Sequence, residues 1–158
     1  MTIRYMIQEL LGKGTFGQVV KCVKKGTSVD FALKVIKNKE AYTKQAKNYE
    51  IKILNQLNKI ETAETNKESL NLNETESTES KGHIIRLLDQ FVFRNHVILV
   101  FELLDVSLYD LLRATSYNGF TLNIIRKLTE QILQGLIILE LSNVIHCDLK
   151  PENILFVK

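Results

Sequence analysis

A short loop near the end of the 158-residue chain carries three side chains that could together transfer a phosphoryl group. Asp148, Lys150 and Asn153 stand in the string His-Cys-Asp-Leu-Lys-Pro-Glu-Asn. A carboxylate can accept the proton of an attacking hydroxyl, a lysine can neutralise phosphoryl charge, and an amide oxygen can bind magnesium. We therefore predict that Asp148 and Lys150 are catalytic and that Asn153 is a metal ligand. The apolar residues at 144–145 and 154–156 predict short strands that hold the loop in a core.

A glycine-rich stretch near the N-terminus could lie over nucleotide phosphates. Gly12, Gly14 and Gly17 form a G-x-G-x-x-G pattern, which dinucleotide-binding folds also use. A dinucleotide site needs a helix directly after the third glycine. Here residues 18–23 read Gln-Val-Val-Lys-Cys-Val, a β-branched run that favours a strand. The flanks therefore favour a strand, glycine loop, strand arrangement over a dinucleotide site.

A lysine on the next predicted strand and a glutamate on the following predicted helix are candidate ion-pair partners. Lys34 stands in Phe-Ala-Leu-Lys-Val, where its side chain could reach the α and β phosphates of ATP. Apolar residues recur at helical spacing over 40–60, and Glu50 falls on their face of the helix. A carboxylate on an apolar face usually needs a cation. The alternatives are a surface lysine on an edge strand and an ordinary exposed glutamate.

Taken together, these motifs resemble the protein kinases, and among them the dual-specificity tyrosine-phosphorylation-regulated (DYRK) kinases of the CMGC group. The most specific mark is Cys147, which stands where most kinases have arginine. The resemblance runs from about Arg4 to Phe156, except for one insertion. It implies an α+β fold with a five-stranded antiparallel sheet, one helix of the αC type and the beginning of a helical lobe. The kinase domain would cover 4–158, with the N-lobe and hinge at 4–104 and the start of the C-lobe at 105–158.

The resemblance also implies where ATP binds. Phe101 resembles the gatekeeper, residues 102–104 the hinge that hydrogen-bonds adenine, and Asp110 a residue near the ribose. Ser107 and Asp110 also fit a capping box for a helix over 108–115, and both roles stay open. The residues predicted to bind ATP are Leu11, Gly12, Lys13, Gly14, Thr15, Phe16, Gly17, Gln18, Val19, Ala32, Lys34, Glu50, Phe101, Glu102, Leu104, Asp110 and Leu155.

Composition narrows the class of protein. The chain is 45% hydrophobic and 25% charged, which is typical of a globular chain. It has two cysteines, too few for a disulfide framework or a zinc site. No signal-peptide core and no run of about eighteen apolar residues is visible. These features predict an intracellular protein, cytoplasmic or nuclear, without a membrane partner. The basic excess is spread along the chain, so we expect no nucleic-acid partner.

An acidic segment interrupts the kinase-like pattern. Residues 61–80 carry six Glu and one Lys, for a net charge of −5, whereas the other 138 residues carry +8. The segment is rich in Ser, Thr, Asn and Glu, and this composition predicts a disordered insertion over 61–81. It falls between the predicted αC-type helix and the fourth strand. The composition of this segment is compatible with a tolerated surface insertion. It is also compatible with a regulatory loop that acid-directed kinases phosphorylate.

The predicted helix from Thr121 to Leu141 is apolar most of the way round in its second half, which predicts burial. Each uncovered Leu or Ile forgoes roughly 1.5–3 kcal/mol. We therefore expect a partner, or a C-lobe missing from these 158 residues, to cover this helix.

The predicted activity is ATP- and Mg²⁺-dependent phosphorylation of protein Ser or Thr, with Tyr as a further acceptor. No Asp-Phe-Gly follows the catalytic loop, so the main magnesium carboxylate is absent from the chain. We expect a kinase fragment without appreciable transferase activity by itself. The alternative is a truncated pseudokinase that acts as a nucleotide-binding or scaffolding module.

Overall fold

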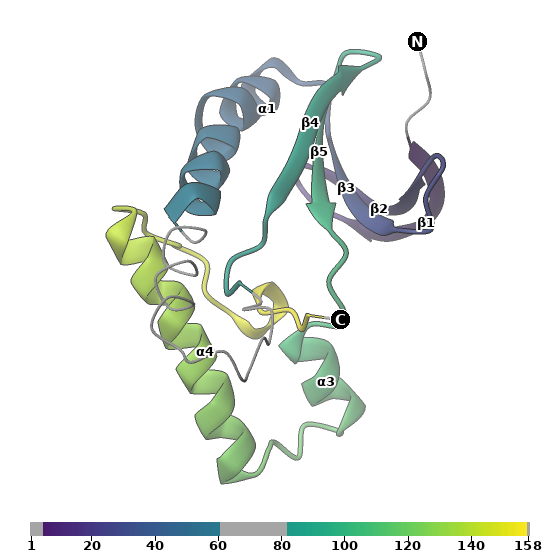
Figure 1. Ribbon diagram of the computed structural model, residues 1–158. Coiled ribbons are helices and arrows are strands. Elements are labelled where there is room, and N and C mark those ends of the chain that lie inside the picture. Colours follow the sequence, from purple (N-terminus) through teal and green to yellow (C-terminus); the bar gives the residue numbers. More distant parts are fainter. Residues whose placement is uncertain (1–4, 61–81, 158) are drawn as a thin grey trace, which may run out of the picture. The chain divides into compact units, whose positions relative to one another are not determined.

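The computed structural model describes residues 5–60 and 82–157 (Figure 1). The predicted acidic insertion at 61–81 lies outside the described residues. The chain divides into two compact units. The first comprises Met1–Asn55 and Ile85–Leu103, and the second comprises Gln56–Ile84 and Leu104–Lys158. The division falls one residue before the predicted hinge boundary, and it assigns the end of the 40–60 helix to the second unit.

The first unit is built on a five-stranded antiparallel sheet with the strand order β1-β2-β3-β5-β4. Arg94 and Asn95 join β4 to β5 with φ values of 46° and 62°, the left-handed conformation of a tight hairpin turn. The predicted fold class is confirmed. The strands are β1 Tyr5–Lys13, β2 Gly17–Lys24, β3 Asp30–Ile36, β4 Leu87–Phe93 and β5 His96–Glu102.

Both faces of this sheet carry apolar side chains, because alternate residues of a strand point to opposite faces. Leu99 and Val100 are neighbours on β5, and both are fully buried, one in each cluster. The cluster on the helix side contains Ala32, Ile36, Ala46, Leu87, Val97, Leu99 and Phe101. The cluster on the other face contains Val20, Cys22, Leu33, Ile98 and Val100. The sheet is therefore a rigid support for the loops at its ends.

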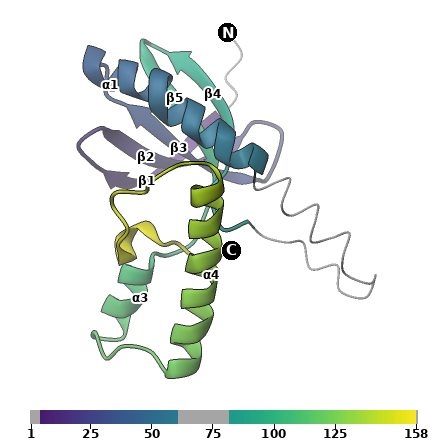
Figure 2. The ribbon, with the colours of Figure 1, turned by 90° about the vertical axis from the view of Figure 1, so that its left-hand side faces the viewer.

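One helix covers the first face of the sheet (Figure 2). It begins as α1 Glu40–Gln45, widens into the π-helical segment η1 Ala46–Glu50, and continues as an α-helix over residues 51–60. Ala46 is 1% exposed and packs in the core cluster. The predicted helix over 40–60 is confirmed, whereas the π-helical turn that ends at Glu50 was not foreseen. Such turns insert one extra residue and often mark functional positions.

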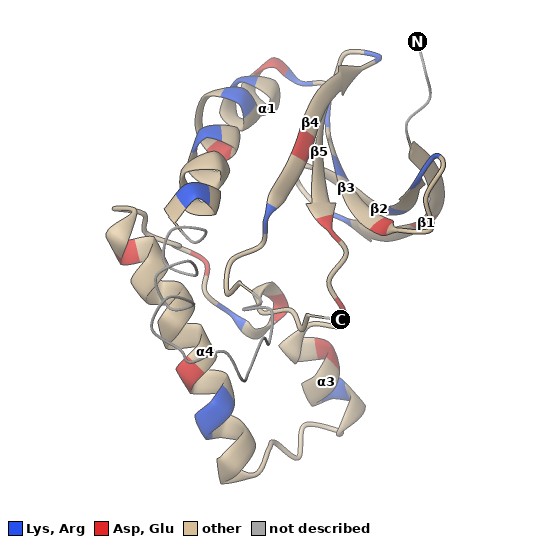
Figure 3. Cartoon of the chain, in the orientation of Figure 1, with Lys and Arg blue, Asp and Glu red and all other residues tan. Residues whose placement is uncertain are grey.

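The second unit contains two helices, α3 Leu108–Ala114 and α4 Leu122–Leu141, and a 3₁₀ turn, η2 Pro151–Asn153. Ile138 and Leu139 of α4 pack with Leu57 to form its small core. Figure 3 shows few charged positions along α4. Six of its large apolar side chains are at least 45% exposed, namely Leu122, Ile124, Ile125, Leu133, Ile137 and Leu141. The predicted helix is thus confirmed, and the described residues leave these side chains uncovered. Within residues 5–60 and 82–157, no helix has the length and apolar character that crossing a membrane requires.

The prediction of a short strand at 144–145, before the catalytic loop, was wrong. Asn143 and Cys147 have φ values of 52° and 63°, so left-handed residues turn the chain on both sides of 144–146 and prevent an extended pairing. Ile145 is consequently 85% exposed. The strand predicted at 154–156, after the loop, is reduced to one antiparallel bridge between Leu155 and Ser107, with backbone hydrogen bonds to residues 105–108 on either side of it.

Candidate nucleotide-binding and phosphoryl-transfer residues

The predicted site residues fall into two groups, one in each unit. In the first unit, the glycine loop is the turn between β1 and β2, closed by a 2.9 Å hydrogen bond from the Gly14 N–H to the Gly17 carbonyl. A Cβ at Gly12 or Gly14 would meet no atom within 4 Å. A Cβ at Gly17 would lie 2.2 Å from the Val35 carbonyl oxygen. The third glycine is therefore required by packing, whereas the first two leave open space above the loop.

The predicted ion pair between Lys34 and Glu50 is present. Lys34 projects from β3, and Glu50 is the last residue of the π-helical turn. Both side chains are 29% exposed, so water screens the pair only partly. The ion pair thus fixes the position of the Lys34 ammonium.

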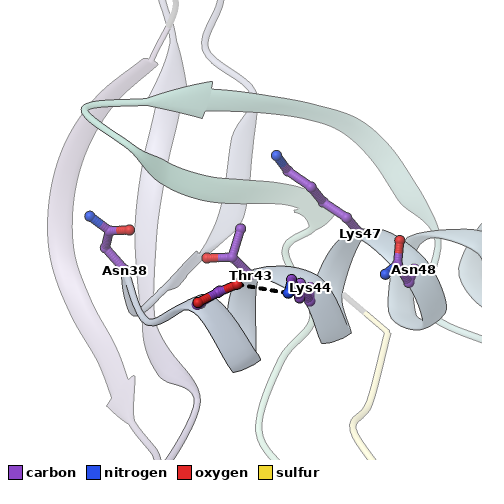
Figure 4. Close-up of a pocket in the computed structure, with 6 residues that line it drawn as sticks. Asn38, Thr43, Lys44, Lys47 and Asn48 are labelled. Carbon is purple, nitrogen blue, oxygen red and sulfur yellow. Dashed lines mark ion pairs between the residues drawn. The ribbon is translucent and has the colours of Figure 1, made fainter.

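Two of the cavities in the described part of the chain lie near this helix, and different residues line them. A cavity of about 320 Å³ contains the Lys34–Glu50 pair and is also lined by Phe16 of the glycine loop. A larger one, of about 410 Å³, lies along the start of α1 (Figure 4). It is lined by Asn38, Glu40, Thr43, Lys44, Lys47 and Asn48, and an ion pair of 2.7 Å joins Lys44 to Glu40. Three of the residues predicted to bind ATP, Phe16, Lys34 and Glu50, line the smaller cavity, and none of the predicted site residues lines the larger one.

The residues predicted to contact adenine differ in accessibility. Ala32 and Phe101 are paired across β3 and β5 and are 9% and 7% exposed, within the core cluster. The Glu102 carboxylate accepts a 3.0 Å hydrogen bond from the Arg86 N–H and lies 3.5 Å from the Arg86 Nε. Arg86 therefore occupies the side chain of Glu102, and only the backbone groups of Glu102 are left for the predicted hydrogen bonds to adenine. Leu11 is 47% exposed on β1.

In the second unit, Asp110 serves as part of a capping box, as one of the two sequence interpretations proposed. The Ser107 Oγ accepts from the Asp110 N–H at 3.1 Å, and the Asp110 carboxylate accepts from the Ser107 N–H at 3.2 Å. The hydrogen bond from the Ser107 hydroxyl is the main cause that lowers the pKa of Asp110. Leu155 lies in the bridge to Ser107 and is 43% exposed.

The catalytic-loop residues are brought together as predicted. The Lys150 Nζ lies 2.9 Å from Asp148 Oδ1, and the Asn153 Nδ2 donates to Asp148 Oδ2 at 3.0 Å and to the Asp148 carbonyl at 2.8 Å. The hydrogen bond from Lys150, followed by that from Asn153, lowers the pKa of Asp148. Because the Asn153 amide nitrogen faces Asp148, its side-chain oxygen is left as the group that can bind a metal. The arrangement gives an ionised carboxylate beside a cation and an amide oxygen.

The sequence comparisons agree with this arrangement. The model of the protein kinase domain family matches residues 5–158. This chain belongs to the protein kinase family. It is 43% identical over 152 residues to a probable serine/threonine-protein kinase yakA of Dictyostelium discoideum, covering 96% of this chain and 9% of that protein. It is 43% identical over 152 residues to a dual specificity protein kinase YAK1 homolog of Arabidopsis thaliana, covering 96% of this chain and 14% of that protein.

A human relative confirms the resemblance to the DYRK kinases. The dual specificity tyrosine-phosphorylation-regulated kinase 4 of Homo sapiens is 39% identical over 151 residues, which cover 96% of this chain and 26% of that protein. These kinases are thus matched over nearly the whole of this chain, which spans about a quarter or less of their own length.

Sequence reasoning missed one contact in the kinase glycine loop. Lys37 follows β3, and its Nζ donates to the carbonyls of Gly14 and Thr15 at 3.0 and 2.9 Å. Lys37 lies in a lysine-rich stretch, and no spacing rule distinguishes it from its neighbours. The contact depends on where the loop carbonyls point, and only the structure gives their direction.

The pairing of Lys150 with Asp148 can be tested by titration. Because the Lys150 ammonium stabilises the ionised carboxylate, a Lys150→Met substitution should raise the pKa of Asp148 toward its ordinary value. NMR detection of the Asp148 carboxyl carbon as a function of pH would measure this pKa. Lys127→Met, at an exposed position of α4, is the matched control. An unchanged midpoint in Lys150→Met would show that the pair does not form in solution.

The two cysteines should react very differently. Cys22 is fully buried, and burial, with the nearby Asp30 carboxylate as a further cause, raises its pKa to about 11. Cys147 is exposed. Since the thiolate is the reactive form, iodoacetamide at pH 8 should modify Cys147 in the native protein and both cysteines after unfolding. Peptide mass spectrometry would identify the sites, and rapid native labelling of Cys22 would contradict the packing described for the sheet.

Proposed function

We propose that this chain is the ATP-binding and catalytic-loop part of a protein kinase that transfers the γ-phosphoryl group of ATP to protein Ser or Thr hydroxyls, and also to Tyr. The observation that carries the proposal is the Asp148 carboxylate, held between the Lys150 ammonium and the Asn153 amide. An oriented, ionised carboxylate beside a cation suits transfer to a hydroxyl, because one group accepts the proton and the other stabilises the phosphoryl charge.

The residues of the first unit would bind ATP in this proposal. The Lys34 ammonium, fixed by Glu50, would contact the α and β phosphates. The open space at Gly12 and Gly14 would let phosphates approach the loop backbone closely. Ala32 and Phe101 would line the adenine side of the site.

Magnesium would be held only in part by the residues described. Asn153 offers one oxygen ligand, and among residues 5–60 and 82–157 no group of three or more His, Cys, Asp and Glu side chains could hold a metal ion. Magnesium is usually bound by one or two carboxylates together with phosphates and waters. We therefore infer that the 158-residue chain alone has no appreciable transferase activity. Steady phosphoryl transfer by the purified chain would contradict this inference.

The experiment that tests the function is phosphoryl transfer from γ-labelled ATP by the full-length protein to a peptide library containing Ser, Thr and Tyr acceptors. The Lys34→Met variant should lose transfer, because the ammonium that contacts the phosphates is gone. Lys25→Met, in the exposed turn after β2, is the matched control. Analysis of the labelled amino acids would decide between Ser/Thr and dual specificity. No transfer by the unsubstituted protein, with ATP binding retained, would favour a nucleotide-binding module instead.

A further inference from the structure

The tip of the glycine loop is held by a residue outside the loop. The Lys37 Nζ donates to the Gly14 and Thr15 carbonyls at 3.0 and 2.9 Å, and the Lys37 N–H donates to the Phe16 carbonyl at 2.9 Å. One residue at the end of β3 therefore binds three consecutive carbonyls of the loop. Hydrogen bonds from a charged donor are shorter and stronger than neutral ones.

This contact fixes the direction of the loop N–H groups. The described residues contain no cis peptide bond, so the carbonyl and the following N–H of each peptide point in opposite directions. Because the Gly14 and Thr15 carbonyls face the Lys37 ammonium, the N–H groups of Thr15 and Phe16 face away from it. Neither of these two N–H groups has an acceptor among the described residues. Successive N–H groups that point to one side form a concavity for anions.

Two further contacts hold the same tip. The Phe16 ring packs edge-on against the Tyr42 ring of α1, with the ring centroids 5.3 Å apart. The Gly14 to Gly17 hydrogen bond closes the turn. The loop is thus restrained by its backbone, by a ring contact and by a cation, and of these only the cation binds the Gly14 and Thr15 carbonyls.

We propose that Lys37 is a positioning residue that orients the Thr15 and Phe16 N–H groups toward the phosphates of a nucleoside triphosphate before the nucleotide binds. This role rests on the proposed ATP-binding function and refines it. It differs from direct phosphate binding, because the Lys37 ammonium faces the carbonyl side of the two peptides. Lys37 is exposed, so its replacement should leave the fold intact.

The test compares Lys37→Met, the conservative Lys37→Arg and the control Lys25→Met in the full chain. Calorimetry would give the affinities for ATP and for adenosine. Amide NMR would report the Thr15 and Phe16 signals without ligand. We expect Lys37→Met to weaken ATP binding about tenfold, the loss of roughly one charged hydrogen bond, with adenosine affinity unchanged. Both amide signals should shift in ligand-free Lys37→Met, and Lys37→Arg should retain most of the ATP affinity.

Each other outcome overturns the proposal in a distinguishable way. Equal ATP affinity in Lys37→Met and the unsubstituted chain would show that the contact does not organise the loop. Equal losses for ATP and adenosine would show a purely structural role. A loss for ATP alone, without a change in the ligand-free amide signals, would show direct attraction of the phosphates. Absence of ATP binding by the unsubstituted chain would instead overturn the proposed function itself.

Discussion

Asp148→Asn in the full-length protein should lower kcat by about 10²–10⁴-fold, the usual contribution of a positioned general base. Asparagine preserves the size of the side chain but cannot accept the hydroxyl proton. It also removes the charge that pairs with Lys150 at 2.9 Å. ATP affinity should change little, because the residues predicted to contact the phosphates, Lys34 and the glycine loop, lie in the other unit.

The measurement is steady-state transfer with the peptide acceptor, with ATP binding measured separately. Glu130→Gln, at an exposed position of α4, also removes one carboxylate and should leave kcat unchanged. An Asp148→Asn variant with the kcat of the unsubstituted protein would exclude this carboxylate as the proton acceptor. A variant that lost ATP binding together with kcat would point to a structural role for Asp148.

Gly17→Ala should reduce the free energy of unfolding by about 1–3 kcal/mol, the cost of forcing an extra methyl group into a packed region. The new Cβ would lie 2.2 Å from the Val35 carbonyl oxygen, which is backbone and cannot rotate away. The β2–β3 pairing would have to shift to accept it. Gly12→Ala and Gly14→Ala meet no atom within 4 Å and should change stability by less than about 0.5 kcal/mol.

Urea unfolding of the three variants under identical conditions would measure these differences. The variant that loses the most stability, Gly17→Ala, should therefore not be the one that loses the most ATP affinity. Gly12→Ala and Gly14→Ala should weaken ATP binding, because their methyl groups enter the space left above the loop. Equal stability of all three variants would mean that the loop adapts to a Cβ at Gly17, and that packing does not explain this glycine.

Much of the fold and of the candidate site could be predicted from local sequence. The Ser107 cap and the 40–60 helix each depend on residues within a few positions of one another. The Lys34–Glu50 pair could be predicted because a carboxylate on the apolar face of a helix needs a cation. The glycine loop could be predicted from the spacing of its glycines and from the β-branched residues that follow it.

Other features depend on backbone geometry that no local pattern encodes. The contact of Lys37 with Gly14 and Thr15 needs the peptide planes of the loop to be known. The strand expected at 144–145 does not form, because Asn143 and Cys147 on either side of it adopt positive φ without being glycine. The π-helical turn at 46–50 interrupts a stretch whose apolar spacing is that of a regular α-helix.

The pairing at the exit of the catalytic loop has a consequence for chain entropy. The Asp105 N–H donates to the Phe156 carbonyl at 2.8 Å, and the Leu108 N–H donates to the Ile154 carbonyl at 2.7 Å, so these bonds close a segment of about fifty residues. The closure cost rises only with the logarithm of segment length, by about 0.6 kcal/mol per doubling. A few residues inserted at 116–120, between α3 and α4, would therefore add very little to that cost. The length of this connection is free to vary while the geometry of the catalytic loop is kept.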